Sequence, residues 1–182
     1  PRFVQLARQA VPPDDRLFDA FAARLSAGDS ANVAQPVALA LSGGGDSVAL
    51  LSLATTWARA RGRTILALTV DHGLSDASAD WSRRARNVAE RLGAQWRGLN
   101  WADPTPGPGV SARARAARHR LIADAAREAG AKVVLFAHTA DDRAEAEWMR
   151  ARGSTLGRLR DWSPSPVWPE GRGLMLMRPL LE

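Results

Sequence analysis

The chain has 182 residues, of which 46% are hydrophobic and 24% are charged, a composition typical of one globular domain with a sizeable core. Cysteine is absent, which excludes disulfide bonds, thiolate metal sites and cysteine nucleophiles. The net charge of +6 is carried almost wholly by arginine, so it reflects either a polyanionic partner or the base composition of the genome.

The N-terminal region, residues 1–35, is predicted to form one helix and a linker. Leu17, Phe21 and Leu25 recur every four residues within residues 14–26, which is helical spacing. The chain contains neither a run of 18 apolar residues nor a hydrophobic signal-peptide stretch. We therefore expect a cytoplasmic protein without a membrane span.

From residue 37 onward the pattern alternates between strand and helix. Alternation at this spacing is typical of a parallel sheet covered by helices on both faces, so the predicted fold class is α/β, a doubly wound, Rossmann-like parallel sheet. Ligands of such sheets bind where the carboxyl ends of the strands meet. The predicted strands span residues 37–41, 65–70, 95–99 and 133–137, and the predicted helices span residues 46–61, 77–92, 111–128 and 140–152.

The turn after the first strand carries the strongest chemical signal. Residues 42–47 read Ser-Gly-Gly-Gly-Asp-Ser and lead directly into an apolar helix. Glycines let a ligand approach the main chain closely, and a helix N-terminus directs free N–H groups at an anion. The loop matches neither the Walker A motif nor Gly-x-Gly-x-x-Gly. We expect a phosphate here; the alternative is a plain strand–helix turn capped by Ser42 or Asp46.

Polar residues also follow the second and fourth strands. Asp71 and His72 either orient a phosphate or metal or serve as turn residues. After the fourth strand, His138 precedes Asp142 and Glu145, whose spacing places both acids on one helix face. These acids either complement the helix dipole or hold a cationic amine, Mg²⁺ or a proton.

The helix predicted at residues 111–128 is rich in arginine. Arg115 and Arg118 lie near one face of it, with His119 beside them. They either form a solvated charged surface or neutralise pyrophosphate or an RNA backbone.

Packing is the predicted role of Trp57, Trp81 and Trp148, with Trp81 at the head of a helical core stripe. The tail, residues 153–182, is rich in proline and tryptophan and contains one short predicted strand at residues 174–177. Its abrupt end predicts that the protein continues beyond the last residue of the chain.

The order and spacing of these motifs resemble the N-terminal catalytic domain of the tRNA(Ile)-lysidine synthetases, which belong to the PP-loop ATP pyrophosphatase superfamily. The resemblance covers residues 37–181 and implies a single PP-loop ATPase domain over residues 1–182. The matching segments are residues 42–47, 70–74, 114–119, 138–145, 152–154 and 178–181.

The resemblance implies an ATP-dependent carbon–nitrogen ligase that uses ATP and Mg²⁺. Such enzymes adenylate the wobble cytidine of tRNA(Ile) with a CAU anticodon, and L-lysine then displaces AMP from C2 of the base. The implied partners are this tRNA and L-lysine, with no membrane; the oligomeric state, a homodimer included, is left open. The alternatives are a catalytically silent ATP- or RNA-binding module and a PP-loop ligase that acts on another amine.

The resemblance also implies the roles of individual residues. Asp46 would place Mg²⁺ or the leaving pyrophosphate, Asp142 and Glu145 would bind the lysine substrate and help deprotonate its amine, and Arg115 would stabilise charge on the adenylated intermediate. The implied nucleotide contacts are Ser42, Gly43, Gly44, Gly45, Asp46, Ser47, Asp71, His72 and His138.

Four positions depart from the family pattern around the lysine and cytidine pocket. They are Thr139 in place of a second histidine, Arg143 in place of glutamine, Ala146 in place of threonine, and His119 in place of tyrosine. The nucleotide loop is intact, so these departures bear on the amine substrate rather than on ATP.

Overall fold

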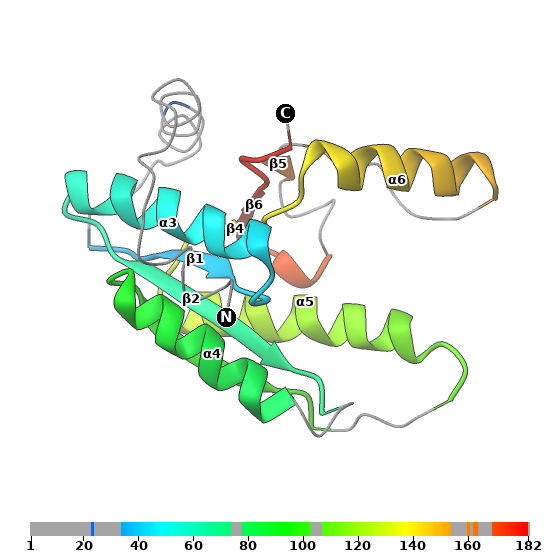
Figure 1. The fold of residues 1–182 in the computed structure, drawn as a ribbon, viewed down its shortest axis with the longest axis horizontal. Coiled ribbons are helices and arrows are strands. Elements are labelled where there is room, and N and C mark those ends of the chain that lie inside the picture. The colour runs from blue at the N-terminus through cyan, green and yellow to red at the C-terminus, as the bar shows by residue number, and fades with distance from the viewer. Residues whose placement is uncertain are drawn as a thin grey trace.

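The computed structural model describes residues 23, 34–73, 78–102, 107–153, 160, 162–163 and 169–181 (Figure 1). The helix predicted at residues 14–26 lies outside these residues, apart from residue 23. The strands are β1 (Val37–Ala40), β2 (Ile65–Asp71), β3 (Gln95–Asn100), β4 (Val133–Leu135), β5 (Trp162–Ser163) and β6 (Met175–Met177). The helices are α3 (Gly45–Ala60), α4 (Ser78–Arg91), α5 (Val110–Glu128), α6 (Ala140–Ala151) and the short 3-10 helix η2 (Pro169–Gly171).

The six strands of the described residues form one sheet in the order β3-β2-β1-β4-β6-β5. The pairs β2–β3, β1–β2, β1–β4 and β4–β6 are parallel, and β5 alone pairs antiparallel, with β6. The predicted doubly wound parallel sheet is therefore confirmed, and β6 is the short strand predicted in the tail. The edge strand β5 was not predicted, because two residues carry no readable periodicity.

The strand order reverses between β1 and β4. From β1 the chain winds outward through β2 to β3, and then returns to the other side of β1 to form β4. Ala38 accordingly pairs with Leu66 on one side and with Val134 on the other. Loops that leave the carboxyl ends of two such strands run to opposite faces of the sheet, which opens a crevice between them.

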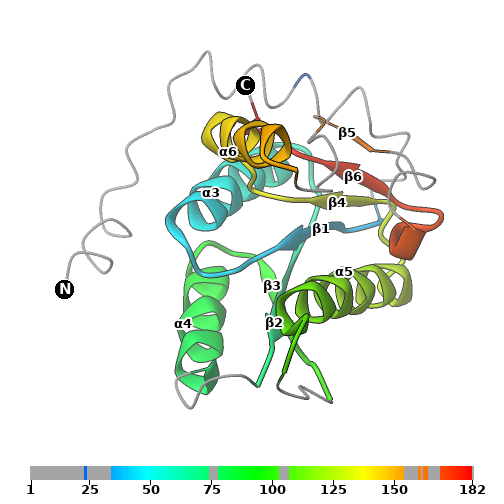
Figure 2. The ribbon, with the colours of Figure 1, turned by 90° about the vertical axis from the view of Figure 1, so that its right-hand side faces the viewer.

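Two cores, one on each face of the sheet, hold the layers together (Figure 2). Leu39 faces α3 and α4 and belongs to a cluster with Leu51 of α3 and Ala85 of α4. Its neighbour Ala38 faces the other way and packs with Ile122 of α5. This alternation along β1 follows from the two-residue period of a strand, and burial on both faces explains why its sequence is continuously apolar.

The tryptophans divide between the core and the surface. Trp57 is 1% exposed, which confirms its predicted packing role. The packing predicted for Trp81 and Trp148 is wrong, because these side chains are 55% and 58% exposed. The guanidinium of Arg152 lies over the ring of Trp148, 3.5 Å from its centroid, so a cation–π contact takes the place of burial.

Helix α6 differs from the other helices of the described residues in that none of its residues is buried. It begins directly after the loop that follows β4, and it lies beyond one end of α3 in Figure 1 and in front of α3 in Figure 2. In the described part of the chain, no helix combines the length and apolar character needed to cross a membrane.

Candidate functional site

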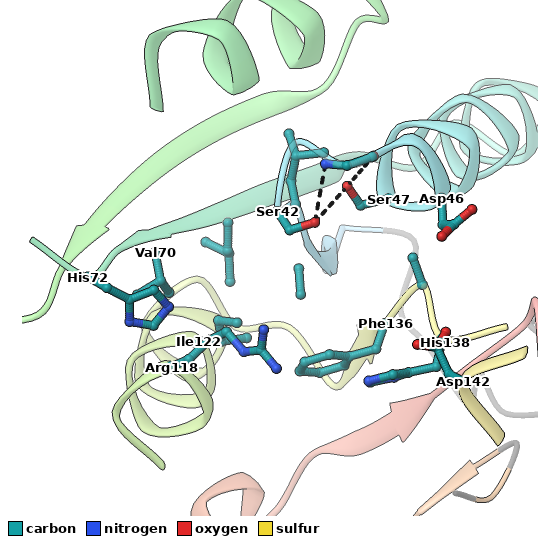
Figure 3. Close-up of a pocket in the computed structure, with 15 residues that line it drawn as sticks. Ser42, Asp46, Ser47, Val70, His72, Arg118, Ile122, Phe136, His138 and Asp142 are labelled. Atoms are coloured by element: carbon teal, nitrogen blue, oxygen red, sulfur yellow. Dashed lines mark hydrogen bonds between the residues drawn. The ribbon is translucent and has the colours of Figure 1, made fainter. Parts of the chain in front are cut away.

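A cavity of about 440 Å³ opens at the carboxyl ends of β1 and β4, at the point where the strand order reverses (Figure 3). The residues that line it come from β1, β2, α3, α5, α6 and the loops that follow β1, β2 and β4. They are Ala40, Leu41, Ser42, Gly44, Asp46, Ser47, Leu68, Val70, His72, Arg118, Ile122, Phe136, Ala137, His138 and Asp142.

One side of the cavity is the glycine loop that joins β1 to α3. Gly43 has φ +86°, a left-handed conformation that residues with side chains rarely adopt. Helix α3 starts after Gly44 without a side-chain cap, so the capping role considered for Ser42 or Asp46 is wrong. The first N–H groups of a helix have no intrahelical acceptor, and here they lie at the edge of the cavity.

The opposite side of the cavity carries a half-buried arginine and a histidine, Arg118 on α5 and His72 after β2. Within the described residues, Arg118 Nε and His72 Nδ1 are buried and have no hydrogen-bond partner. Burial lowers the pKa of Arg118, and the charge of Arg115 lowers it further. Burial, and then the charge of Arg118, also lower the pKa of His72. A buried cation with an unused donor favours an anionic ligand beside it.

His138 lies beside Asp142, and its ring stacks on Phe136 with 6.0 Å between centroids and 14° between planes (Figure 3). Burial lowers its pKa to about 4, the charge of Arg178 adds to this effect, and the carboxylate of Asp142 opposes it. His138 is therefore a neutral imidazole at pH 7. Burial, followed by nearby positive charges, likewise lowers the pKa of His119 to about 4.

Asp142 contributes a carboxylate to the cavity from the first turn of α6. Its Oδ2 accepts hydrogen bonds from the backbone N–H of Thr139 at 2.7 Å and from the Thr139 hydroxyl at 3.1 Å. This capping arrangement fixes the start of α6 and holds the carboxylate in place. Thr139, which replaces a histidine of the family pattern, therefore positions Asp142.

The structure gathers seven of the predicted site residues around the cavity: Ser42, Gly44, Asp46, Ser47, His72, His138 and Asp142. Gly43 and Gly45 belong to the loop without lining the cavity. Neither Asp71, Arg115 nor Glu145 lines it. The Asp71 carboxylate accepts the backbone N–H of Gly73 at 2.8 Å, which makes Asp71 a turn residue here, whereas Arg115 and Glu145 are exposed to solvent.

Two residues that contact His138 were not predicted from local pattern. Arg178 is 7% exposed and contacts His138 from the end of β6, and Phe136 supports the rings of His138 and His119. The signal for Arg178 was its place in the segment at residues 178–181 that resembles the family. Nothing in the spacing of residues 136 and 178 indicates their contact with the site.

A divalent cation fits the carboxylates of this cavity only if a bound substrate supplies further atoms that coordinate the cation. In the described ranges, no three His, Cys, Asp or Glu side chains gather into a metal site. Asp46 and Asp142 both line the cavity, however, and Mg²⁺ commonly binds through one or two carboxylates together with substrate phosphates and water.

Comparison of the amino-acid sequence with known proteins gives three matches. A PP-loop domain family matches residues 17–182. The tRNA(Ile)-lysidine synthase of Caulobacter vibrioides is 53% identical over 146 residues, which are 80% of this chain and 36% of that protein. The enzyme of the same name from Methylobacterium nodulans is 41% identical over 178 residues, 96% of this chain and 50% of that protein. The chain thus spans half or less of these relatives.

Comparison of structures agrees on the fold. The U34-tRNA thiolase NcsA from Methanococcus maripaludis, solved with its [4Fe-4S] cluster, matches with a TM-score of 0.68 over 92% of this chain and 60% of that chain. At 18% identity, this similarity concerns the fold alone. The resemblance inferred from the sequence motifs is confirmed by the sequence relatives. With its glycine loop at the switch point of a parallel sheet, the chain belongs to the PP-loop domain family.

Proposed function

We propose that this chain carries the nucleotide-activating site of a tRNA(Ile)-lysidine synthase. In this reaction the 2-oxo oxygen of the wobble cytidine attacks the α-phosphorus of ATP and pyrophosphate leaves. The ε-amine of L-lysine then attacks C2 of the base, AMP leaves, and the amine loses a proton. The observation that most supports this function is the loop at residues 42–47. It borders a cavity of about 440 Å³ at the point where the strand order reverses between β1 and β4.

The phosphates of ATP belong at the glycine loop. Its helix N-terminus supplies N–H donors that have no intrahelical acceptor, together with the positive end of a dipole, and both favour negative charge. Asp46 lies in the first turn of α3 and lines the same cavity, so it is placed to hold Mg²⁺ against the phosphates. The cation would supply charge neutralisation for the leaving pyrophosphate.

The opposite side of the cavity suits the atoms at which charge develops. Arg118 offers a buried donor that has no hydrogen-bond partner among the described residues, and His138 offers a neutral imidazole. A fixed cation in a buried site stabilises a developing oxyanion more strongly than it would in water. Arg115, exposed on the same helix, lowers the pKa of Arg118 and is therefore close enough to add positive charge at the entrance.

The amine belongs on the side of α6. Asp142 lines the cavity and Glu145 lies one turn further along the exposed helix, so together they form an acidic side for a cationic lysine. This placement keeps the cationic amine away from the phosphates. The lysine therefore does not form an ion pair with ATP and remains available to attack the activated base.

The test is incubation of the chain with radiolabelled L-lysine, ATP and a tRNA(Ile) transcript with a CAU anticodon. We expect label in the RNA only when ATP is present, and none in a transcript whose wobble cytidine is replaced by uridine. Because the chain spans half or less of its relatives, we expect slow modification together with ordinary ATP binding. ATP binding without any label would indicate a silent module, and label from ornithine instead of lysine would indicate another amine substrate.

A further inference from the structure

The end of β6 brings a buried arginine against the histidine of the cavity. Met177 pairs with Leu135, and the backbone N–H of Phe136 donates to the carbonyl of Met177 at 2.9 Å. This parallel register places Arg178 beside His138, although 40 residues separate them in the chain. Arg178 Nε then donates a hydrogen bond to His138 Nδ1 at 3.2 Å.

A second hydrogen bond fixes the guanidinium in this position. Arg178 Nη1 donates to the backbone carbonyl of Arg160 at 2.7 Å, and the side chain of Arg178 is 7% exposed. A planar guanidinium held at two points, with little access to water, has few alternative orientations. The position of its Nε–H relative to the imidazole is therefore set by the sheet and not by chance rotation of a surface side chain.

The chemistry of this contact determines the position of a proton. A guanidinium has donors and no acceptor, so the His138 nitrogen that faces it must use a lone pair. A neutral imidazole whose Nδ1 accepts carries its hydrogen on Nε2. Burial and the charge of Arg178 both disfavour a second proton, since they lower the pKa of His138 to about 4.

We propose that Arg178 is a positioning residue that holds His138 as the Nε2–H tautomer, so that His138 presents a hydrogen-bond donor to an acceptor oxygen of the substrate in the cavity. The oxygen is a phosphate oxygen of ATP or the 2-oxo group of the cytosine, and either one accepts the same bond. This assignment rests on the proposed function for the identity of the oxygen only.

The proposal also defines what His138 does not do. With Nδ1 engaged by Arg178 and Nε2 already protonated, His138 has no free lone pair with which to take a proton from the lysine amine. Asp142 and Glu145 are then the bases available on that side of the site. His138 instead acts as a neutral donor, which adds no net charge to a cavity that already contains Arg118.

The tautomer is directly measurable, because the chain contains only three histidines. We would record imidazole ¹⁵N–¹H long-range correlation spectra of the ¹⁵N-labelled chain and assign His138 by comparison with H72N and H119N. The proposal predicts an Nε2–H signal for His138 at pH 7.5 and an imidazole pKa well below the ordinary value. An Nδ1–H signal, or a charged His138 at this pH, overturns it whatever the activity of the protein.

Two substitutions separate the hydrogen bond from the charge. R178Q keeps an N–H donor and removes the charge, so we expect the Nε2–H tautomer to persist while the pKa of His138 rises. R178M removes both, so we expect a mixture of tautomers and a similar rise in pKa. R172M, an exposed arginine in the turn before β6, is the control and should leave the spectrum of His138 unchanged. Retention of one tautomer in folded R178M contradicts the proposal.

Activity provides the second readout. We expect kcat for ATP–pyrophosphate exchange, measured with the tRNA(Ile) transcript present as the acceptor of AMP, to fall on the order of tenfold in R178M and clearly less in R178Q. KM for ATP should be nearly unchanged, since a misplaced proton removes a donor needed in the transition state. Addition of ATP alone, and then of a cytidine-containing anticodon stem-loop, shows which ligand shifts the Nε2–H resonance. Absence of exchange in the unaltered chain would contradict the proposed function while leaving the tautomer measurement valid.

Discussion

The hydroxyl of Ser42 donates a hydrogen bond of 3.1 Å to the hydroxyl of Ser47, which in turn donates to the carbonyl of Gly44 at 2.8 Å. The two serines thereby tie the end of β1 to the first turn of α3. Ser42 also accepts the N–H of Gly44 at 3.3 Å. The loop is thus shaped before a ligand arrives, which lowers the entropic cost of ordering it on binding.

The conformation of Gly43 gives a first prediction. At φ +86°, an alanine is strained although nothing lies within 4 Å of its Cβ, so G43A should lower the free energy of unfolding by about 1–2 kcal/mol and weaken ATP binding. The matched control is G45A, since Gly45 starts α3 and also has open space around it. Urea denaturation and calorimetry check both; equal destabilisation by the two variants would show that the backbone of Gly43 is not under this constraint.

Asp46 gives a second prediction. D46A should reduce tRNA-dependent ATP–pyrophosphate exchange by about a hundredfold or more, because it removes the cavity carboxylate that we propose holds Mg²⁺ against the phosphates. D80A is the control, since Asp80 also lies in the first turn of a helix, α4, but on the surface and paired with Arg83. Unchanged exchange in D46A would remove Asp46 from the mechanism.

The acids of α6 give a third prediction. E145Q should raise KM for lysine about tenfold and leave KM for ATP unchanged, since it removes one of the two carboxylates that we propose bind the amine. E147Q tests the same change at an exposed position of the same helix and should alter neither constant. If E145Q affects both substrates equally, the lysine does not bind at this side of the cavity.

The buried histidines give a fourth prediction, on pH. Burial and nearby positive charges lower the pKa of both His119 and His138 to about 4 in the folded state, so the unfolded chain, with histidines near 6.5, binds more protons between these values. The free energy of unfolding should therefore be constant above pH 7 and fall as the pH decreases from about 6.5 towards 4. Urea titrations of the double variant H119N/H138N should show a flatter dependence between pH 7 and 5. An identical slope in both proteins would contradict the lowered pKa values.

The tryptophans give a fifth prediction. W57A should cost about 3–5 kcal/mol, because Trp57 is 1% exposed and its loss leaves a cavity between α3 and the sheet. W148A should cost less than about 1 kcal/mol, since the ring is 58% exposed and loses only its cation–π contact with Arg152. The denaturation midpoints of the two variants, measured under the same conditions, test this prediction. Similar losses of unfolding free energy in W57A and W148A would mean that the Trp148 side chain is covered in solution.

Sequence periodicity predicted the layers but not the surroundings of individual side chains. The predicted bounds of α3, α4, α5 and α6 are correct within one residue at each end, because caps, glycines and apolar spacing are local signals. Trp81 was wrongly assigned to the core. Its position on a helical stripe indicates which face of α4 it lies on, but not whether another element covers that part of the face. For the same reason α6 has a clear helical pattern and no buried residue.

The alternation of strands and helices, the glycine loop after β1 and the residues that carry the family resemblance could be read from the amino-acid sequence, because each depends on neighbours only a few positions apart. Which polar groups share the cavity depends on the folding of distant segments against one another. The tertiary structure brought Asp142 and His138 to the loop and left Glu145 and Arg115 at the surface. It also placed Arg178 against His138, since the register between two strands is set by packing of the whole sheet and not by local pattern.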